Sequence, residues 1–274
     1  MTNDRRVRVG TMDATELLDT AAEAARSVGP RLREAFRSRP AVDTKRDFHD
    51  PVTEHDRAAE EAIRAVIEAR APGSAVVGEE GGATGSGDLV WYVDPIDGTA
   101  NFAAGLPYFC VSIAAAVHGE LVAGVVYDPV RDDAFTASTE GAWCNGEPIR
   151  SRGAAGDREA MLLCSYPQPG DLEAEGDEAL LRYGRLLRAF STIRRPGSTA
   201  LNLAHVAAGW SDATYGTGSQ PWDVAAGALL VRQAGGVYLG DPLVKGDYLA
   251  HVGGFDLAGS ALAEVSGRLR RTPS

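Results

Sequence analysis

The sequence contains few cysteines, and their spacing excludes two common kinds of site. Only three occur among the 274 residues, Cys110, Cys144 and Cys164, and no two of them form a Cys-x-x-Cys pair. A disulfide framework or a structural zinc site needs more cysteines at closer spacing. We therefore expect three buried thiols in a reducing compartment.

Long apolar runs and long basic runs are also missing. The charged start of the chain is followed by no apolar leader and no 18-residue apolar span, so we expect a cytoplasmic protein without a membrane partner. The chain has 38 acidic and 27 basic residues, a formal net charge of -11. This balance argues against nucleic acid as a partner, although a locally bound cation would still allow an anionic substrate.

What remains has the composition of a globular protein, 44% hydrophobic and 24% charged. Helical periodicity predicts helices over 13–37, 53–70, 176–190, 199–208, 224–233 and 257–270. Short apolar runs predict strands over 75–77, 89–93, 109–117, 121–127, 133–136, 161–164, 213–215 and 237–239. We predict an α/β protein with an α+β half, 1–150, and an α/β half, 151–274, joined through the polar segment 145–159.

The densest chemical signal is Trp-Tyr-Val-Asp-Pro-Ile-Asp-Gly-Thr-Ala-Asn-Phe, residues 91–102. An apolar strand runs directly into Asp94 and Asp97, and buried carboxylates are costly unless they are paired or bind a metal. Pro95 stiffens the turn, so both carboxylates can face the same space. If a helix starts near Gly98, its N–H groups suit an oxyanion, and a hard cation such as Mg²⁺ would join the two parts.

Two further acidic motifs lie at a distance from this one. Val76-Val77-Gly78-Glu79-Glu80-Gly81 ends a predicted strand, and Gln220-Pro221-Trp222-Asp223-Val224-Ala225-Ala226-Gly227 begins an apolar helix. Taken alone, the first motif is typical of a solvated loop and the second of a helix cap. Their combination with the 91–102 motif is far more specific.

The three motifs, in this order, resemble those of the inositol monophosphatase family, within the lithium-sensitive, magnesium-dependent phosphatases that include fructose-1,6-bisphosphatases. The resemblance covers roughly residues 45–236. It implies a layered αβαβα sandwich and a homodimer. It also implies a phosphomonoesterase that uses two to three Mg²⁺ ions.

The resemblance implies a set of metal ligands. Glu79, Asp94 and the Ile96 carbonyl would bind a first ion, and Asp94, Asp97 and Asp223 a second. Glu79 would also help to hold a weaker third ion.

It implies the catalytic groups as well. Asp56 matches a buried aspartate that hydrogen-bonds the motif threonine, here Thr99. Glu79 and the Thr99–Asp56 pair would orient a metal-bound water or accept its proton, while the Gly98 and Thr99 amides hold phosphate oxygens. No Ser or Cys nucleophile is required.

Two charged residues near these motifs receive lesser roles. Glu80 follows the metal-binding glutamate and supports the shell around the ions. Lys45 stands where the family carries a mobile-loop lysine near the site, and an ordinary exposed lysine is the equal alternative.

The specificity positions depart from the family pattern. Family members specific for inositol phosphates have a glutamate seven residues before the motif aspartate, and here that position is Gly216. The segment Gly197-Ser198-Thr199 matches a stretch that borders the polyol. Loss of the glutamate removes charge-assisted hydrogen bonds to hydroxyl groups, so strict inositol specificity is not expected.

Three functions stay open at this stage. The first is a phosphatase for inositol monophosphate or a similar small polyol or sugar phosphate. The second is a relative acting on fructose 1,6-bisphosphate, histidinol phosphate or a 3′-phosphonucleotide, with Arg194 and Arg195 either near a second phosphate or simply solvated. The third is a non-catalytic regulatory or binding protein, which the complete set of ligand positions argues against.

Overall fold

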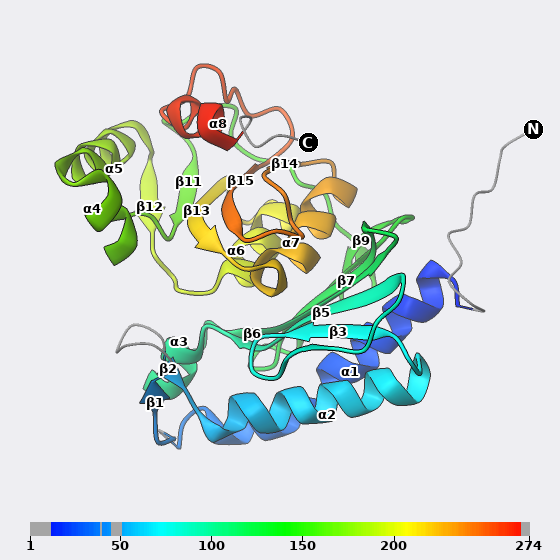
Figure 1. The fold of residues 1–274 in the computed structure, drawn as a ribbon. Coiled ribbons are helices and arrows are strands. Elements are labelled where there is room, and N and C mark those ends of the chain that lie inside the picture. Colours follow the sequence, from blue (N-terminus) through cyan, green and yellow to red (C-terminus); the bar gives the residue numbers. More distant parts are fainter. Residues whose placement is uncertain (1–11, 39, 45–50, 270–274) are drawn as a thin grey trace, which may run out of the picture.

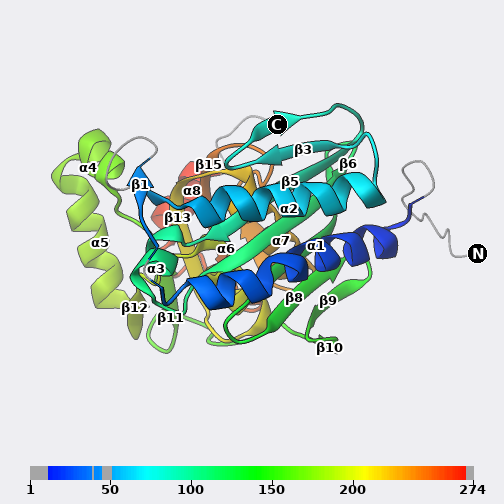
Figure 2. The same cartoon turned by 90° about the horizontal axis from the view of Figure 1, so that it is seen from below.

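The computed structural model describes residues 12–38, 40–44 and 51–269, and its helices and sheets alternate in five layers (Figure 1). The first layer consists of α1 (Ala14–Ala35) and α2 (Glu54–Arg70), which lie side by side across one face of the larger sheet (Figure 2). The predicted capping box starts α1. Asp13 accepts hydrogen bonds from the Thr15 and Glu16 N–H groups at 3.0 and 3.1 Å, and Glu16 accepts one from the Asp13 N–H at 2.8 Å.

The second layer is an eight-stranded sheet with the order β10-β9-β8-β7-β6-β5-β3-β4. Its strands are β3 (Ala75–Gly78), β4 (Gly82–Thr84), β5 (Leu89–Asp97), β6 (Cys110–Val117), β7 (Glu120–Asp128), β8 (Asp133–Ser138), β9 (Gly141–Cys144) and β10 (Glu147–Pro148). Neighbouring strands are antiparallel except for β3 and β5, which run parallel. The parallel pair places the ends of β3 and β5 at the same edge of the sheet.

The middle layer consists of α6 (Thr199–Ala208) and α7 (Pro221–Gln233). Small residues allow α7 to approach both of its neighbours. A Cβ atom on Gly227 would lie 2.4 Å from Leu203 Cβ in α6, and one on Gly124 of β7 would lie 3.0 Å from Ala226 Cα. The Ala-Ala-Gly part of the Asp223 motif therefore sets how close the start of α7 comes to the larger sheet.

The fourth layer is a five-stranded sheet with the order β12-β11-β13-β15-β14. Its strands are β11 (Met161–Cys164), β12 (Thr192–Arg194), β13 (Ala213–Ser219), β14 (Val237–Leu239) and β15 (Gly246–His251). The remaining short elements outside this sheet are α3 (Thr99–Ala104) and a two-stranded hairpin of β1 (Asp43–Thr44) and β2 (Pro51–Val52).

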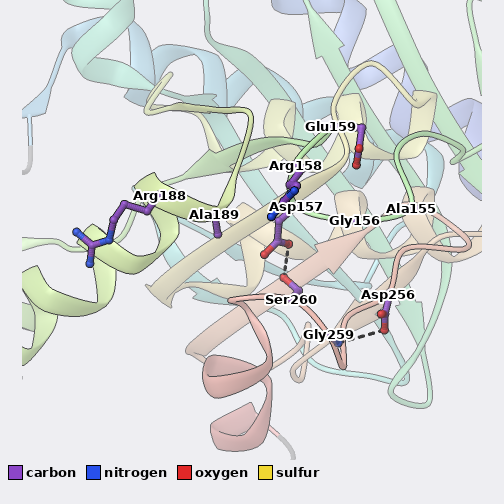
Figure 3. Close-up of a pocket in the computed structure, with 10 residues that line it drawn as sticks. All are labelled: Ala155, Gly156, Asp157, Arg158, Glu159, Arg188, Ala189, Asp256, Gly259 and Ser260. Atoms are coloured by element: carbon purple, nitrogen blue, oxygen red, sulfur yellow. Dashed lines mark hydrogen bonds between the residues drawn. The ribbon is translucent and has the colours of Figure 1, made fainter.

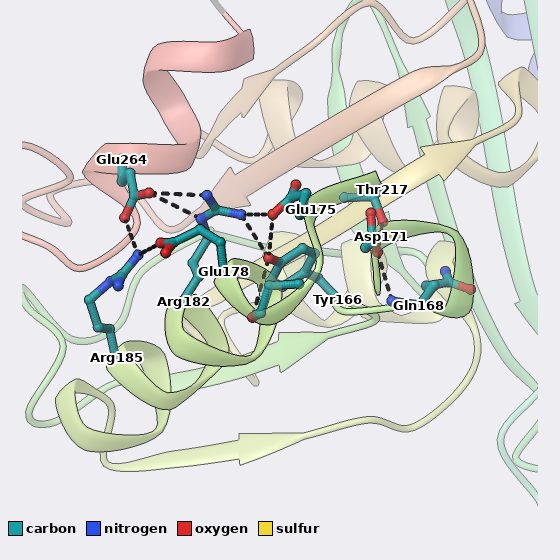
Figure 4. A network of polar contacts seen from close by, with 10 residues as sticks. Tyr166, Gln168, Asp171, Glu175, Glu178, Arg182, Arg185, Thr217 and Glu264 are labelled. Carbon is teal, nitrogen blue, oxygen red and sulfur yellow. Dashed lines mark hydrogen bonds and ion pairs between the residues drawn. The ribbon is translucent and has the colours of Figure 1, made fainter. Parts of the chain in front are cut away.

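The outer layer contains α4 (Pro169–Glu175), α5 (Asp177–Ala189) and α8 (Ala263–Leu269), which a buried arginine joins (Figure 4). Arg182 is only 1% exposed. It donates hydrogen bonds to Glu175, to the Tyr166 hydroxyl at 2.7 Å and to Glu264 at 3.2 Å. Because each partner belongs to a different segment, the guanidinium fixes this layer to the smaller sheet.

The layered α/β architecture confirms the predicted fold class, and several local predictions need correction. The helix predicted over 257–270 begins only at Ala263, because Asp157 and Asp256 hydrogen-bond the backbone N–H groups of Ala261 and Gly259 and hold turns there. Helix α4 and the short strands β4, β9, β10, β12 and β15 were not predicted. Strand β5 continues to Asp97 instead of ending at residue 93.

One hydrophobic core contains residues from both sheets, including Val126 and Phe135 of the larger sheet and Leu162 and Leu249 of the smaller one. A second core lies between α1, α2 and the larger sheet. The predicted division near residue 150 stays a prediction. Within the described residues, no helix combines the length and the apolar character needed to cross a membrane.

Candidate functional site

The Asp94–Asp97 segment forms an irregular end of β5. Asp94 is paired with Ser112 of β6 and Asp97 with Cys110, so β5 has one more residue than its partner between the two pairs. Such a bulge redirects side chains, and proline is tolerated there because the regular ladder is already interrupted. The backbone N–H of Ile96 donates to Asp94 Oδ1 at 3.0 Å, which fixes the first carboxylate relative to the bulge.

Four carboxyl groups converge at this bulge. Asp94 is 2% exposed, and burial raises the pKa of its carboxyl well above the ordinary value. The negative charges of Glu79, Asp97 and Asp223 raise this pKa further, and Glu79 also hydrogen-bonds the Asp94 carboxyl. The structure therefore brings together the acidic residues of all three motifs.

The donor groups of this cluster have the chemistry that a hard metal ion requires. Within the described parts of the chain, no three His, Cys, Asp or Glu side chains form a ready coordination shell; instead, the Asp94 and Glu79 carboxyl groups share a hydrogen bond. Two carboxylates this close repel each other unless a proton or a cation lies between them. Because hard oxygen donors and clustered negative charge favour a divalent cation over that proton, the residues present fit Mg²⁺.

Asp97, the last residue of β5, contacts the N-terminal end of α6. Its Oδ2 atom accepts hydrogen bonds from the Ser198 hydroxyl and the Ala200 N–H, at 2.6 Å each. Burial raises the pKa of Asp97, and these hydrogen bonds oppose that effect because they favour the ionised carboxylate. The positive end of α6 acts in the same direction.

Asp223 occupies the third position of α7, where its Oδ2 atom accepts a hydrogen bond from the Gln220 N–H at 2.8 Å. Asp223 is therefore the third helical residue of a capping box, not the N-cap predicted for it alone, because Gln220 occupies that position; it also lies beside Asp94. The preceding carbonyl, that of Trp222, accepts a hydrogen bond from Ser112 Oγ at 2.9 Å. Since Ser112 is also the strand partner of Asp94, it ties the start of α7 to the bulge.

Thr99 and Asp56 form the predicted hydrogen-bonded pair. The Thr99 hydroxyl lies 2.9 Å from Asp56 Oδ1 and 3.0 Å from the Ile96 carbonyl oxygen. The other carboxylate oxygen of Asp56 accepts from the N–H and hydroxyl of Thr53, at 2.8 and 2.6 Å. Asp56 is fully buried, so its orientation is set by the start of α2 on one side and by Thr99 on the other.

Gly98 makes the transition from β5 to α3 with φ of +100°. A Cβ atom here would lie 3.1 Å from the Tyr108 carbonyl oxygen and 3.2 Å from the Gly197 carbonyl oxygen. Only glycine meets both the backbone and the space requirement. The expected helix start near Gly98 is therefore present.

The residues predicted to border the substrate lie in two places, at the start of α6 and in β13. The Ser198 side chain is buried and directed to Asp97, while Gly197 and Thr199 flank it at the start of α6. Gly216 is enclosed in β13, where a Cβ atom would lie 2.5 Å from Ser165 Oγ and 2.6 Å from Tyr248 Cε1. Lys45 lies outside the described residues.

Arg194 and Arg195 border a separate cavity of about 290 Å³, together with Tyr108, His205 and Trp210. The Arg195 guanidinium donates to the Pro167 carbonyl at 2.9 Å. None of the four converging carboxylates lines this cavity. The positions of Arg194 and Arg195 therefore do not support the binding of a second phosphate.

A second cavity, of about 440 Å³, lies between residues 155–159 and 256–260 (Figure 3). Asp157 accepts hydrogen bonds from the Ser260 hydroxyl at 2.5 Å and from the Ala261 N–H at 2.8 Å. Arg188 extends away from the other lining residues in Figure 3. None of the four carboxylates of the candidate site lines this cavity. Asp157 and Asp256 instead hydrogen-bond groups of the 259–261 segment.

Glu60 is a buried residue beside the site that the sequence analysis did not single out. It is 2% exposed, and its two carboxylate oxygens accept hydrogen bonds from the N–H groups of Glu80 and Gly81, at 2.7 and 2.8 Å. These contacts hold the turn that carries Glu79. A possible signal was its place on the apolar face of α2, beside Ala59 and Ile63.

Glu60→Gln is expected to destabilise the fold by about 1–3 kcal/mol, because the amide offers one acceptor in place of two and turns a donor toward backbone N–H groups. We also expect weaker Mg²⁺ binding, since the Glu79 turn loses a support. Denaturant titration and calorimetric metal titration measure the two effects. Glu61→Gln, an exposed neighbour on α2, is the control; equal behaviour of both variants would contradict the assignment.

His205 is expected to make the stability depend on pH. Burial, and then the charge of Arg131, lower the pKa of this histidine to about 4. An unfolded chain takes up the proton near pH 6.5, so stability is complete above that pH and falls as the pH decreases toward 4. The loss amounts to roughly 3 kcal/mol. His205→Gln should flatten the Tm profile between pH 6.5 and 4, and parallel profiles for both proteins would contradict this prediction.

Comparison with known proteins agrees with this geometry. The profile of the inositol monophosphatase family matches residues 13–256. Nus factor SuhB of Pseudomonas aeruginosa is 43% identical over 230 residues, which cover 81% of this chain and 84% of that protein.

Two solved structures share the fold. The extragenic suppressor protein SuhB of Bartonella henselae matches with a TM-score of 0.83 at 30% identity and covers 94% of this chain and 99% of its own. The inositol monophosphatase of Anabaena matches with a TM-score of 0.77 at 30% identity, covering 94% and 97%. The chain belongs to the inositol monophosphatase family.

Proposed function

We propose that this protein is a Mg²⁺-dependent phosphomonoesterase that hydrolyses inositol monophosphate or a similar small polyol or sugar phosphate. The main support is the convergence of Glu79, Asp94, Asp97 and Asp223 on one bulge. Family membership supports the same reaction.

Each group of the site has a role in this proposal. Glu79, Asp94, the Ile96 carbonyl, Asp97 and Asp223 would hold two to three ions. When bound, Mg²⁺ neutralises the phosphate charge, lowers the pKa of a bound water and stabilises the leaving oxygen. Glu80 supports the turn beside Glu79.

The Thr99–Asp56 pair positions the attacking water. Because Thr53 occupies one oxygen of Asp56, the other oxygen is directed to the Thr99 hydroxyl. With its hydrogen donated to Asp56, Thr99 Oγ1 accepts a hydrogen bond from the water, and Glu79 accepts the proton that the water loses. The Gly98 and Thr99 amides would then bind phosphate oxygens.

The surroundings of Gly216 support a substrate range beyond inositol phosphates. Gly216 lacks the carboxylate associated with inositol specificity. Ser165 and Tyr248 occupy the space that a side chain at this position would enter. The Gly197–Thr199 segment would border the alcohol. A panel of inositol monophosphate, fructose 1,6-bisphosphate, histidinol phosphate and a 3′-phosphonucleotide, compared by kcat/KM at saturating Mg²⁺, tests the substrate class. A strong preference for any of the last three substrates would replace the proposed one.

A second candidate function is a regulatory binding role on the same scaffold. It is favoured by the relative named Nus factor SuhB, a name that points to transcription. A purified protein that releases no phosphate from any panel substrate, with or without Mg²⁺, would favour this candidate. The expectation that nucleic acid is not a partner stays a prediction and can be tested by RNA binding at physiological salt.

We further propose that the protein acts as a cytoplasmic homodimer. The homodimer is inferred from the family resemblance. The cytoplasmic location is inferred from the lack of a long apolar run in the sequence. Analytical ultracentrifugation of the purified chain measures its oligomeric state directly.

A further inference from the structure

Asn101 connects the aspartate motif to the segment that precedes α6. Its Nδ2 atom donates one hydrogen bond to the Tyr108 carbonyl and one to the Pro196 carbonyl, at 2.7 Å each. Pro196 is 95 residues away in sequence. A single side chain therefore joins α3, directly after the aspartate motif, to a distant part of the fold.

The two acceptors define which side chain can serve here. An amide nitrogen carries two N–H donors, whereas a hydroxyl carries one and a carboxylate carries none. Since both partners are carbonyl oxygens, they also determine which end of the amide faces them. A Cβ atom on Gly197 would lie 3.0 Å from Asn101 Nδ2, so the backbone passes close to the amide.

The contact with Pro196 leads directly to a candidate metal ligand. Two residues after Pro196, the Ser198 hydroxyl donates to Asp97 Oδ2 at 2.6 Å, and the Ala200 N–H donates to the same atom at 2.6 Å. Asp97 ends β5, and Asn101, four residues later, is the third residue of α3, so both belong to the β5–α3 segment. The turn and the α6 start are thus joined at two places, through Asp97 and through Asn101.

We propose that Asn101 is a positioning residue that presets the Asp97 carboxylate for binding a divalent cation. This inference rests on the proposed function. Without the amide, the 196–198 segment loses its second attachment, and the Ser198 hydroxyl and α6 N–H groups no longer meet Asp97 in one geometry. Supporting hydrogen-bond partners of metal ligands typically change metal affinity by about 10–100-fold.

The test is titration of the full-length protein with Mn²⁺ and with Mg²⁺ by calorimetry, without substrate. Asn101→Ala is expected to weaken binding of one ion by about 10–100-fold. Asn101→Asp, which has nearly the same shape, is expected to weaken it at least as much because it faces two carbonyls without a donor. In steady-state assays, kcat should fall more than KM rises at fixed low Mg²⁺, and added Mg²⁺ should partly restore it.

Asn145→Ala is the control for a purely structural effect. Asn145 also makes two side-chain hydrogen bonds, but in the turn between β9 and β10: its Nδ2 atom donates to Asp133 and its Oδ1 atom accepts from the Ala134 N–H. It should lower Tm without changing metal affinity. Asn101 variants that lose Tm while their Mn²⁺ affinity stays within about twofold of the wild type would overturn the inference. A wild-type protein that binds no Mn²⁺ would instead contradict the proposed function.

Discussion

Asp94→Asn is expected to lower Mg²⁺-dependent phosphate release by roughly a thousandfold or more. The substitution removes a negative oxygen donor from the centre of the four-carboxylate cluster, where Asp94 is proposed to contact two ions. The same change should leave the metal-free fold intact or more stable. Because burial and the neighbouring carboxylates raise the pKa of Asp94, its ionised form costs stability at neutral pH, and a neutral amide removes that cost.

Asp128→Asn provides a closely matched control. Asp128 is also 2% exposed, also stands before a proline at the end of a strand in the same sheet, and also accepts a hydrogen bond from the N–H two residues later. Its partner is Arg131, at 2.6 Å, instead of other carboxylates. We expect this variant to lose stability but to keep its Mg²⁺ response. Full turnover in Asp94→Asn would contradict the assigned site.

Gly98→Ala is expected to impair both folding and catalysis. The αL backbone costs about 1–2 kcal/mol for alanine, and the new Cβ atom would press on two carbonyl groups, those of Tyr108 and Gly197. To relieve these contacts, the β5–α3 turn must shift relative to the α6 start. A displacement of about 1 Å can lower kcat by roughly a hundredfold.

The glycine at the other end of α3 separates backbone strain from displacement of the site. Gly105 has φ of +75°, but a Cβ atom there would meet only the Phe36 carbonyl oxygen, at 3.5 Å. Gly105→Ala should therefore lose stability without a comparable loss of kcat. Thermal unfolding and steady-state kinetics of both variants measure the difference, and equal kcat values would show that the turn is not critical.

The sequence motifs predicted the residues that converge, and the structure explains how they do so. Asp94, Asp97 and Asp223 could be assigned because their motifs, taken together, resemble those of the inositol monophosphatase family. The contribution of Ser112 could not be predicted, since its hydroxyl meets the Trp222 carbonyl only after α7 has packed on the larger sheet.

The same reason applies to Glu60 and to Gly216. A glutamate on a helix is usually solvated, and only the fold shows that Glu60 binds the turn beside Glu79. The sequence showed that Gly216 has no carboxylate. It did not show that Tyr248, in the unpredicted strand β15, occupies the space beside Gly216. Contacts between distant segments thus account for most of what the motifs left open.

The most direct test of the central claim is phosphate release by the purified, chelator-treated protein as Mg²⁺ is added. With inositol monophosphate as substrate, we predict that release is absent without the metal, rises with Mg²⁺ to saturation, and is lost in Asp94→Asn but retained in Asp128→Asn. Absence of Mg²⁺-stimulated release from this substrate and from every other member of the panel would contradict the account.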